Sequence, residues 1–531
     1  MAPQPAMAPL AALATIAAGA LACSGRAAAP AAPSKPAPAA APAVGGDDGP
    51  MSDPDEYAID HVSWDAGAAL FARTGLGDPY RVGVPYPVYL ALVKAYPQVL
   101  GGDLQAMADR FGMIARAPDP ASDDRDAREG LPVGLHLTDD PITGVPFVVH
   151  SCALCHSREV HWSGGAAMII GAGNPRLRIH AYDAAFAQVT RLPGFDVGAL
   201  AAEAERQAAA HGVAWPYDWR QPLVQATVDG LKLRARDRAA FLDCVAGGPP
   251  GRVATIESFA LALGARLGRT VTTGPDVGWA KIPDVVGFAA RTTLSFDGAG
   301  EGPMDVLVVE ADLAAGARPS WFVRHPLEGA SLGAYLRQPD RSAPFPGPID
   351  RAAAARGHAL FDDDCAPCHG LYAADGRVRR YREDVVALAD VGTDPARALA
   401  VSDDFVAAAA DPRLAPDLPP GTLRTRRTGG YVPPILTSVW LHAPYGHAGQ
   451  WASLAMLATP PAQRPARYTI DLAAPYDLVH VGIAAAAAGA TGPGVYTHDG
   501  TRPGLGVGGH PFLSDLGPAD AAAVVEYLKT L

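Results

Sequence analysis

The sequence predicts a mainly α-helical protein with long irregular loops. Several segments place Ala, Leu, Glu and Arg at the spacing of one helix face, which is the primary signal of a helix. Alternation of apolar and polar residues, the pattern of a half-buried strand, nowhere runs for more than about five residues. The chain holds 57 Gly and 51 Pro among its 531 residues, a share that is typical of proteins with many loops.

Five segments are expected to be helices. The first four cover residues 199–210, 239–245, 255–267 and 350–362. Asp350 follows Pro348 and is expected to cap the fourth helix, because its side chain can accept hydrogen bonds from the first turn. The last covers 518–531, with Gly517 before it and Pro518 in the first turn, where a missing N–H costs nothing.

Charge and hydropathy exclude two classes of protein. The 43 basic and 55 acidic side chains give a net charge of −12, whereas nucleic acids and anionic membranes attract Lys and Arg. No apolar run after the N-terminal region reaches the roughly 18 residues that a membrane span requires. We therefore expect no nucleic-acid partner and no membrane-spanning segment in the mature chain.

The N-terminal region predicts export. Residues 1–23 resemble a signal peptide, because small and apolar residues lead up to Cys23. In a lipoprotein signal Cys23 would be acylated and would be the protein's membrane anchor. The basic start of a signal is missing, and the alternative is a disordered Ala-rich leader. Residues 24–56 are rich in Ala and Pro and predict a disordered linker, because they cannot bury apolar area.

Four of the six cysteines form two motifs of one spacing, C-x-x-C-H. The motifs are Cys152-Ala-Leu-Cys155-His156 and Cys365-Ala-Pro-Cys368-His369. This spacing allows two thioethers to one haem while the adjacent His ligates its iron. A zinc site and a redox C-x-x-C pair are the alternatives, but zinc needs four converging ligands and a redox pair does not need the His twice. The motifs therefore predict two covalently bound haem c groups.

The position of the motifs predicts the location and the domains of the protein. Haem c is attached outside the cytoplasm, so the motifs independently indicate a periplasmic or secreted protein. Each half of the chain carries one motif, and a Pro-rich stretch precedes the helix at 350–362. We expect an N-terminal haem c domain at 57–345 and a C-terminal cytochrome c domain at 346–531. The predicted fold thus becomes two cytochrome c-like haem domains.

Further motifs occur in a fixed order along residues 75–531. They are GLPVG before HSCALCHS, Arg356-Gly357 to Phe361 before CAPCHG, the run GGYVPPILTSVWLHAPYGHAGQW, PPAQRP at 460–465, Tyr476-Asp477, Val481-Gly482, and GLGVGGH before a final EYLKTL. In these motifs the sequence resembles the di-haem cytochromes c that include bacterial rubber oxygenases, relatives of the di-haem cytochrome c peroxidases.

The resemblance implies axial ligands for the second haem. His156 and His369 are the proximal ligands of the two haems on the motif alone. The rubber-oxygenase branch implies His510 as the distal ligand of the second haem, and His447 and Met456 remain alternatives. Ligation by two histidines would give this haem a lower potential than ligation by His and Met, which suits storage or relay of electrons.

For the first haem the resemblance implies an open or weakly occupied distal side, where O₂ or peroxide could bind. His150, His161 and His180 are the candidate ligands nearest in sequence. For each, a hydrogen bond to a haem propionate or to the backbone is the alternative. Phe296, in LSFDG, stands where relatives often carry Trp.

Together these features predict an exported di-haem oxidoreductase of electron transfer. Its first haem would meet O₂, peroxide or another small oxidant, and its six-coordinate second haem would exchange electrons with a redox partner protein or a small-molecule donor or acceptor. A dioxygenase that cleaves polyisoprenoids or other alkenes is one alternative, and it needs an apolar channel to an open iron. A plain electron carrier without substrate is the other. Channel width and the sixth ligand depend on tertiary structure.

Overall fold

The computed structural model describes residues 64–73, 83–140, 143–285, 288–302, 326–337, 343–414 and 424–531. The predicted signal with Cys23 and the predicted linker at 24–56 lie outside the described residues. Among the described helices, none has the length and the apolar character that crossing a membrane requires.

Helices, 3₁₀ turns included, make up 42% of the described residues. In chain order the α-helices are α1 (Trp64–Arg73), α3 (Tyr86–Ala95), α4 (Pro97–Leu100), α5 (Leu104–Phe111), α6 (Arg125–Arg128), α7 (Ile179–Val189), α8 (Val197–Ala210), α9 (Tyr217–Asp237), α10 (Ala239–Val245), α11 (Thr255–Leu267), α14 (Pro326–Leu336), α15 (Arg351–Asp364), α16 (Ala366–His369), α17 (Leu388–Val391), α18 (Asp403–Ala409), α19 (Leu454–Leu457), α20 (Phe512–Asp515) and α21 (Pro518–Leu528).

All five predicted helices are confirmed, as α8, α10, α11, α15 and α21. The predicted caps are also present. The Asp350 side chain accepts hydrogen bonds from the N–H groups of Ala352 and Ala353, both at 3.0 Å. Gly517 precedes α21 and Pro518 occupies its first turn.

Strands make up 14% of the described residues and form many small antiparallel sheets. They are β1 (Val84–Pro85), β2 (Leu135–Asp139), β3 (Pro146–His150), β4 (Ser157–Trp162), β5 (Gly165–Ile170), β6 (Arg252–Val253), β7 (Ala280–Lys281), β8 (Thr293–Leu294), β9 (Gly300–Glu301), β10 (Leu371–Tyr372), β11 (Val378–Arg380), β12 (Val386–Ala387), β13 (Arg424–Thr425), β14 (Gly430–Tyr431), β15 (Arg467–Asp471) and β16 (Val495–Asp499). The two three-stranded sheets have the orders β1-β3-β2 and β13-β9-β8, and the others are pairs.

The prediction of a mainly α-helical fold is therefore wrong, and the protein is a mixed α and β structure. Many of its strands are two residues long, which is too short for an alternating pattern to be recognised. Several pair with distant segments, as β9 does with β13, and their pairing depends on packing rather than on a local turn. The hairpin β4–β5 is longer, but its six-residue strands also exceed the expected length only slightly.

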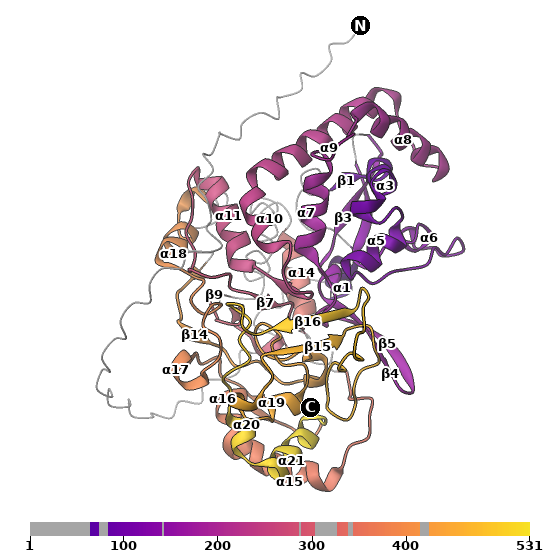
Figure 1. Cartoon of the computed structure of the whole chain (residues 1–531). Coiled ribbons are helices and arrows are strands. Elements are labelled where there is room, and N and C mark those ends of the chain that lie inside the picture. The colour runs from indigo at the N-terminus through magenta and orange to yellow at the C-terminus, as the bar shows by residue number, and fades with distance from the viewer. Residues whose placement is uncertain are drawn as a thin grey trace.

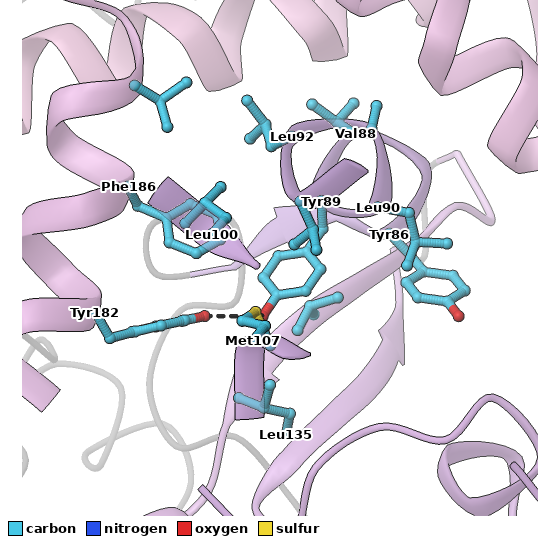
Figure 2. Packing of buried hydrophobic residues seen from close by; sticks show 14 of the residues in the cluster. Tyr86, Val88, Tyr89, Leu90, Leu92, Leu100, Met107, Leu135, Tyr182 and Phe186 are labelled. Atoms are coloured by element: carbon cyan, nitrogen blue, oxygen red, sulfur yellow. Dashed lines mark hydrogen bonds between the residues drawn. The ribbon is translucent and has the colours of Figure 1, made fainter. Parts of the chain in front are cut away.

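The largest buried cluster near the N-terminus joins helices α3, α5, α7, α8 and α9 to strands β2 and β3. Its centre is aromatic (Figure 2): the Tyr89 ring stacks on Phe186 with 5.4 Å between centroids, and its hydroxyl lies 3.1 Å from that of Tyr182. The same hydroxyl donates to the sulfur of Met107 at 3.1 Å. Aromatic packing of this kind supplies a large apolar area while each polar atom keeps a partner.

The described residues do not show two cytochrome c-like domains, which corrects the second part of the predicted fold. Buried clusters cross the predicted boundary near residue 345. One packs Val160 and Ala172 among C-terminal residues, and another packs Ile256 of α11 with Phe405 of α18. In Figure 1 the early helices α7, α8 and α9 form one end of the molecule and α15 with α21 the other, with β15 and β16 between them.

We expect Gly357→Ala to destabilise the protein. Gly357 lies in α15, where an added Cβ would stand 1.9 Å from the Ala523 carbonyl oxygen of α21, so the two helices must separate. The expected loss in free energy of unfolding is about 1 to 3 kcal/mol, measured by urea denaturation.

The matched control is Gly230→Ala in α9, where the added Cβ meets nothing within 4 Å. Its expected effect is a gain of about 0.5 to 1 kcal/mol, because Ala favours a helix more than Gly does. Equal effects of the two substitutions would contradict the close approach of α15 and α21.

Candidate haem-attachment sites

The second motif lies where α15 ends and the short helix α16 begins. Cys365 caps α16 and is half-buried, whereas Cys368 is exposed. His369 is the last residue of α16, and Gly370 follows with φ +81°. An added Cβ at Gly370 would lie 2.4 Å from the Arg380 carbonyl oxygen, so glycine lets the chain turn against β11.

The imidazole of His369 is held in one tautomer. Its Nδ1 lies 2.9 Å from the carbonyl oxygen of Pro434, and a carbonyl can only accept, so Nδ1 carries the hydrogen. Burial lowers the pKa of His369, which keeps the ring neutral. The Tyr372 hydroxyl also donates to the His369 carbonyl at 2.9 Å. The remaining nitrogen, Nε2, therefore has a lone pair for a metal ion.

His510 lies opposite His369 in the same cavity. The two ring centroids are 6.2 Å apart and the ring planes are inclined at 57°. Burial lowers the pKa of His510 to about 3, and its Nδ1 is buried without a described hydrogen-bond partner. Its backbone has φ +48°, a conformation that residues other than glycine rarely adopt.

The cavity around these histidines is large and mostly apolar. Cys365, Cys368, His369 and His510 all line it, and its volume is about 280 Å³. Its apolar walls include Phe361, Ile435, Leu436, Val439, Leu513 and Leu528. The fold thus brings the second motif and His510 together in one apolar site.

The two alternative ligands are placed differently. His447 lines the cavity, but it stacks on Tyr431 at 4.4 Å between centroids and its Nε2 lies 3.2 Å from the Tyr431 hydroxyl. Its Nδ1 lies 3.4 Å from the Gln450 amide. Met456 belongs to α19, whose residues Leu454 and Leu457 line the cavity while Met456 does not. Of the three candidates, only His510 has a described ring contact with His369.

The first motif lies on a 3₁₀ turn, Cys152–Leu154, between strands β3 and β4. His156 repeats the arrangement of His369: its Nδ1 lies 2.9 Å from the carbonyl oxygen of Pro283. Burial again lowers the pKa of the imidazole. Backbone hydrogen bonds fix the turn, from His156 N to the Cys152 carbonyl at 2.9 Å and from Asn174 N to the Cys155 carbonyl at 2.9 Å.

The three histidines considered as further ligands of the first haem have separate surroundings. His180 accepts a hydrogen bond at Nε2 from the Ala254 N–H at 2.9 Å, so this lone pair is already used. His161 is half-exposed in β4, 3.2 Å from Glu159. His150 is half-buried at the end of β3 near the Tyr182 ring, and the loss of solvation lowers its pKa to about 4.

The two motif sites meet at a segment that the sequence reasoning missed, Lys281 to Asp284. Pro283 accepts from His156 and also lines the cavity that contains His369. Asp284 Oδ2 lies 3.0 Å from His442 Nε2, and both side chains are buried. Main-chain acceptors have no side-chain signal in a sequence. The prolines in IPDV and VPPI, whose carbonyls face the two histidines, are the feature that could have suggested them.

The thiols of Cys155 and Cys365 are poor candidates for disulfide exchange. Burial raises the pKa of Cys155 to about 12, and burial with the Asp364 charge raises that of Cys365 to about 12. Disulfide exchange uses the thiolate, which these surroundings disfavour. Among the described residues no group of three or more His, Cys, Asp and Glu is arranged to hold a metal ion.

Comparison with known proteins gives a partial match. No protein-family model matches the sequence. The chain is similar to uncharacterized protein y4iM of Sinorhizobium fredii, with 32% identity over 163 residues, which cover 26% of this chain and 35% of that protein. The chain thus spans about a third of the length of this relative, and the similarity shows neither a family nor an activity.

We expect His180 to make stability depend on pH. Burial lowers its pKa to about 4, whereas an unfolded His titrates near 6.5. Between these values the unfolded chain binds more protons than the folded one, so stability falls as the pH drops from about 6.5 to about 4. His180→Gln cannot take up the proton, and between pH 7.5 and 4.5 it should lose about 1 to 3 kcal/mol less than the parent in urea denaturation.

His480→Gln is the control, because the His480 side chain is 61% exposed and an exposed ion pair, here with Asp477, contributes little to stability. This variant should keep the pH dependence of the parent. The same pH dependence in His180→Gln and the parent would contradict the prediction.

Proposed function

We propose that this protein is an exported di-haem c-type cytochrome that acts as an oxidoreductase in electron transfer. The observation that carries the proposal is the facing of His369 and His510 across an apolar cavity that Cys365 and Cys368 also line. His156 and His369 each donate from Nδ1 to a proline carbonyl, and this shared arrangement is the reason that the proposal includes the first motif.

The spacing of the two rings fits one metal ion between them. Imidazole nitrogens stand about 2.0 to 2.1 Å from a metal, so two rings on opposite sides of it have centroids roughly 6 to 6.5 Å apart. The observed 6.2 Å falls in this range.

The residues around the second motif have distinct tasks in this proposal. Cys365 and Cys368 would hold the haem by thioethers, and His369 and His510 would bind its iron. When bound, the haem supplies reversible one-electron transfer at iron. The Pro434 carbonyl keeps the His369 ring oriented, and the apolar walls exclude water. Two His ligands and the apolar walls both influence the potential of the haem, and ligation by His rather than Met lowers that potential.

At the first motif, Cys152, Cys155 and His156 would hold the other haem in the same way. Two of the three further histidines are poorly placed to act as its second ligand, because His180 accepts a backbone hydrogen bond and His161 is half-exposed beside Glu159. This observation favours an oxidoreductase with an accessible first haem over a plain carrier.

The test is haem content and spin state of protein matured in a periplasm with haem-attachment machinery. We expect two covalent haems for each chain by pyridine haemochrome, and one after substitution of both cysteines of either motif by Ala. Low-temperature EPR of the oxidised protein should show one high-spin and one low-spin haem. His510→Ala should convert the low-spin signal to high spin, because the ring facing His369 is removed.

His480→Ala, at an exposed histidine, should leave the spectrum unchanged. Absence of covalent haem would refute the proposal. An unchanged low-spin signal in His510→Ala would refute only the ligand assignment, and two low-spin haems in the parent would favour the plain electron carrier.

A further inference from the structure

Arg464 makes five hydrogen bonds to main-chain carbonyls, three of them in the loop that carries His510. Its guanidinium donates to five main-chain carbonyls from two segments of chain. The acceptors are Leu457 at 3.0 Å, Thr459 at 2.8 Å, Val507 at 3.2 Å, Gly509 at 2.6 Å and His510 at 3.2 Å. The first two belong to the region of α19, whose leucines line the cavity, and the other three lead into the proposed ligand.

Arg464 is a buried cation that none of the described carboxylates pairs with. Its side chain is only 5% exposed, and burial lowers its pKa to about 10, so it stays charged at neutral pH. The guanidinium lies over the Trp451 ring, 5.2 Å from its centroid. Trp451 in turn donates from Nε1 to the Val507 carbonyl at 2.8 Å, and its ring is 5.9 Å from that of His510.

The loop needs such support because its backbone is strained at the ligand. Gly509 has φ +77° and His510 has φ +48°. A residue other than glycine is strained in this region and persists there only when its surroundings hold it in place. On one side the His510 N–H donates to the Val391 carbonyl at 2.7 Å. On the other side the carbonyls point to Arg464.

We propose that Arg464 is a positioning residue that holds the loop 507–510 so that the His510 imidazole faces His369. The proposal rests on the proposed function, because it assigns Arg464 a role through a haem ligand. The planar, permanently charged guanidinium has five N–H donors and can bind all five carbonyls. A lysine could not, because its ammonium group has three donors around a single nitrogen. Without the guanidinium, the hydrogen bonds that stabilise the strained backbone of His510 are lost, and its ring moves away from His369.

The test compares Arg464→Lys and Arg464→Gln with the parent, all loaded with haem. We expect both variants to keep two covalent haems while the low-spin EPR signal of the second haem gives way to a high-spin one. Added imidazole should restore the low-spin signal, because the distal position is then open. Merely structural damage would not be rescued by a free ligand.

Arg467→Lys is the matched control, because Arg467 is exposed and bonds Asp499 at 3.1 and 2.8 Å. It should keep the parent spectrum. A parent-like low-spin signal in both Arg464 variants would overturn the positioning role, and so would loss of haem or of the fold in Arg464→Lys, which would mark Arg464 as a general structural residue.

His510→Ala measured in parallel separates the two proposals. Conversion to high spin in His510→Ala but not in the Arg464 variants refutes the positioning role and leaves the ligand assignment intact. An unchanged signal in His510→Ala refutes the ligand assignment, and the role of Arg464 with it.

Discussion

Three buried cations hold the loop 441–449 against the N-terminal part of the chain, and both candidate sites depend on this contact. Arg158 donates to the carbonyls of Leu441 and Ala443, both at 2.7 Å. Arg252 donates to the Ala448 carbonyl at 2.8 Å and to that of Gly449, and Lys281 donates to the carbonyls of His442 and Pro444. Burying a charge is costly, and these bonds to carbonyls offset the loss of water.

The contact has a direct consequence for the arrangement of the motifs. Lys281 begins the segment whose Pro283 carbonyl orients His156, and His442, which its side chain binds, lines the cavity of His369. Burial lowers the pKa of Lys281 to about 7, so its charge is the most weakly held of the three. The two candidate sites are therefore connected by one buried polar cluster, which consists of Lys281, Asp284 and His442.

The described residues use one device repeatedly, a main-chain carbonyl that accepts from a side chain and thereby orients it. Pro283 and Pro434 orient the two motif histidines, and the carbonyls near His510 receive Arg464. Every residue type has a main-chain carbonyl, so the sequence does not show which residues act as these acceptors.

The helices were predictable because their signals are local: Asp350 caps α15 and Pro518 begins α21 in the positions that the sequence indicates. The sheets were not, because strands of two residues such as β9 and β13 have no period and find each other only by packing.

By itself the sequence determined the helices with strong caps, the two C-x-x-C-H motifs and a short set of candidate ligands that included His510. These features are carried by side-chain identity over a few residues, and spacing alone makes them visible. Only the tertiary structure decided that the fold is mixed, that His510 rather than His447 or Met456 faces His369, and that Pro283 connects the two sites. These outcomes depend on buried contacts between distant segments. Many of these contacts are made by backbone groups, which every residue has, so the sequence carries no signal for them.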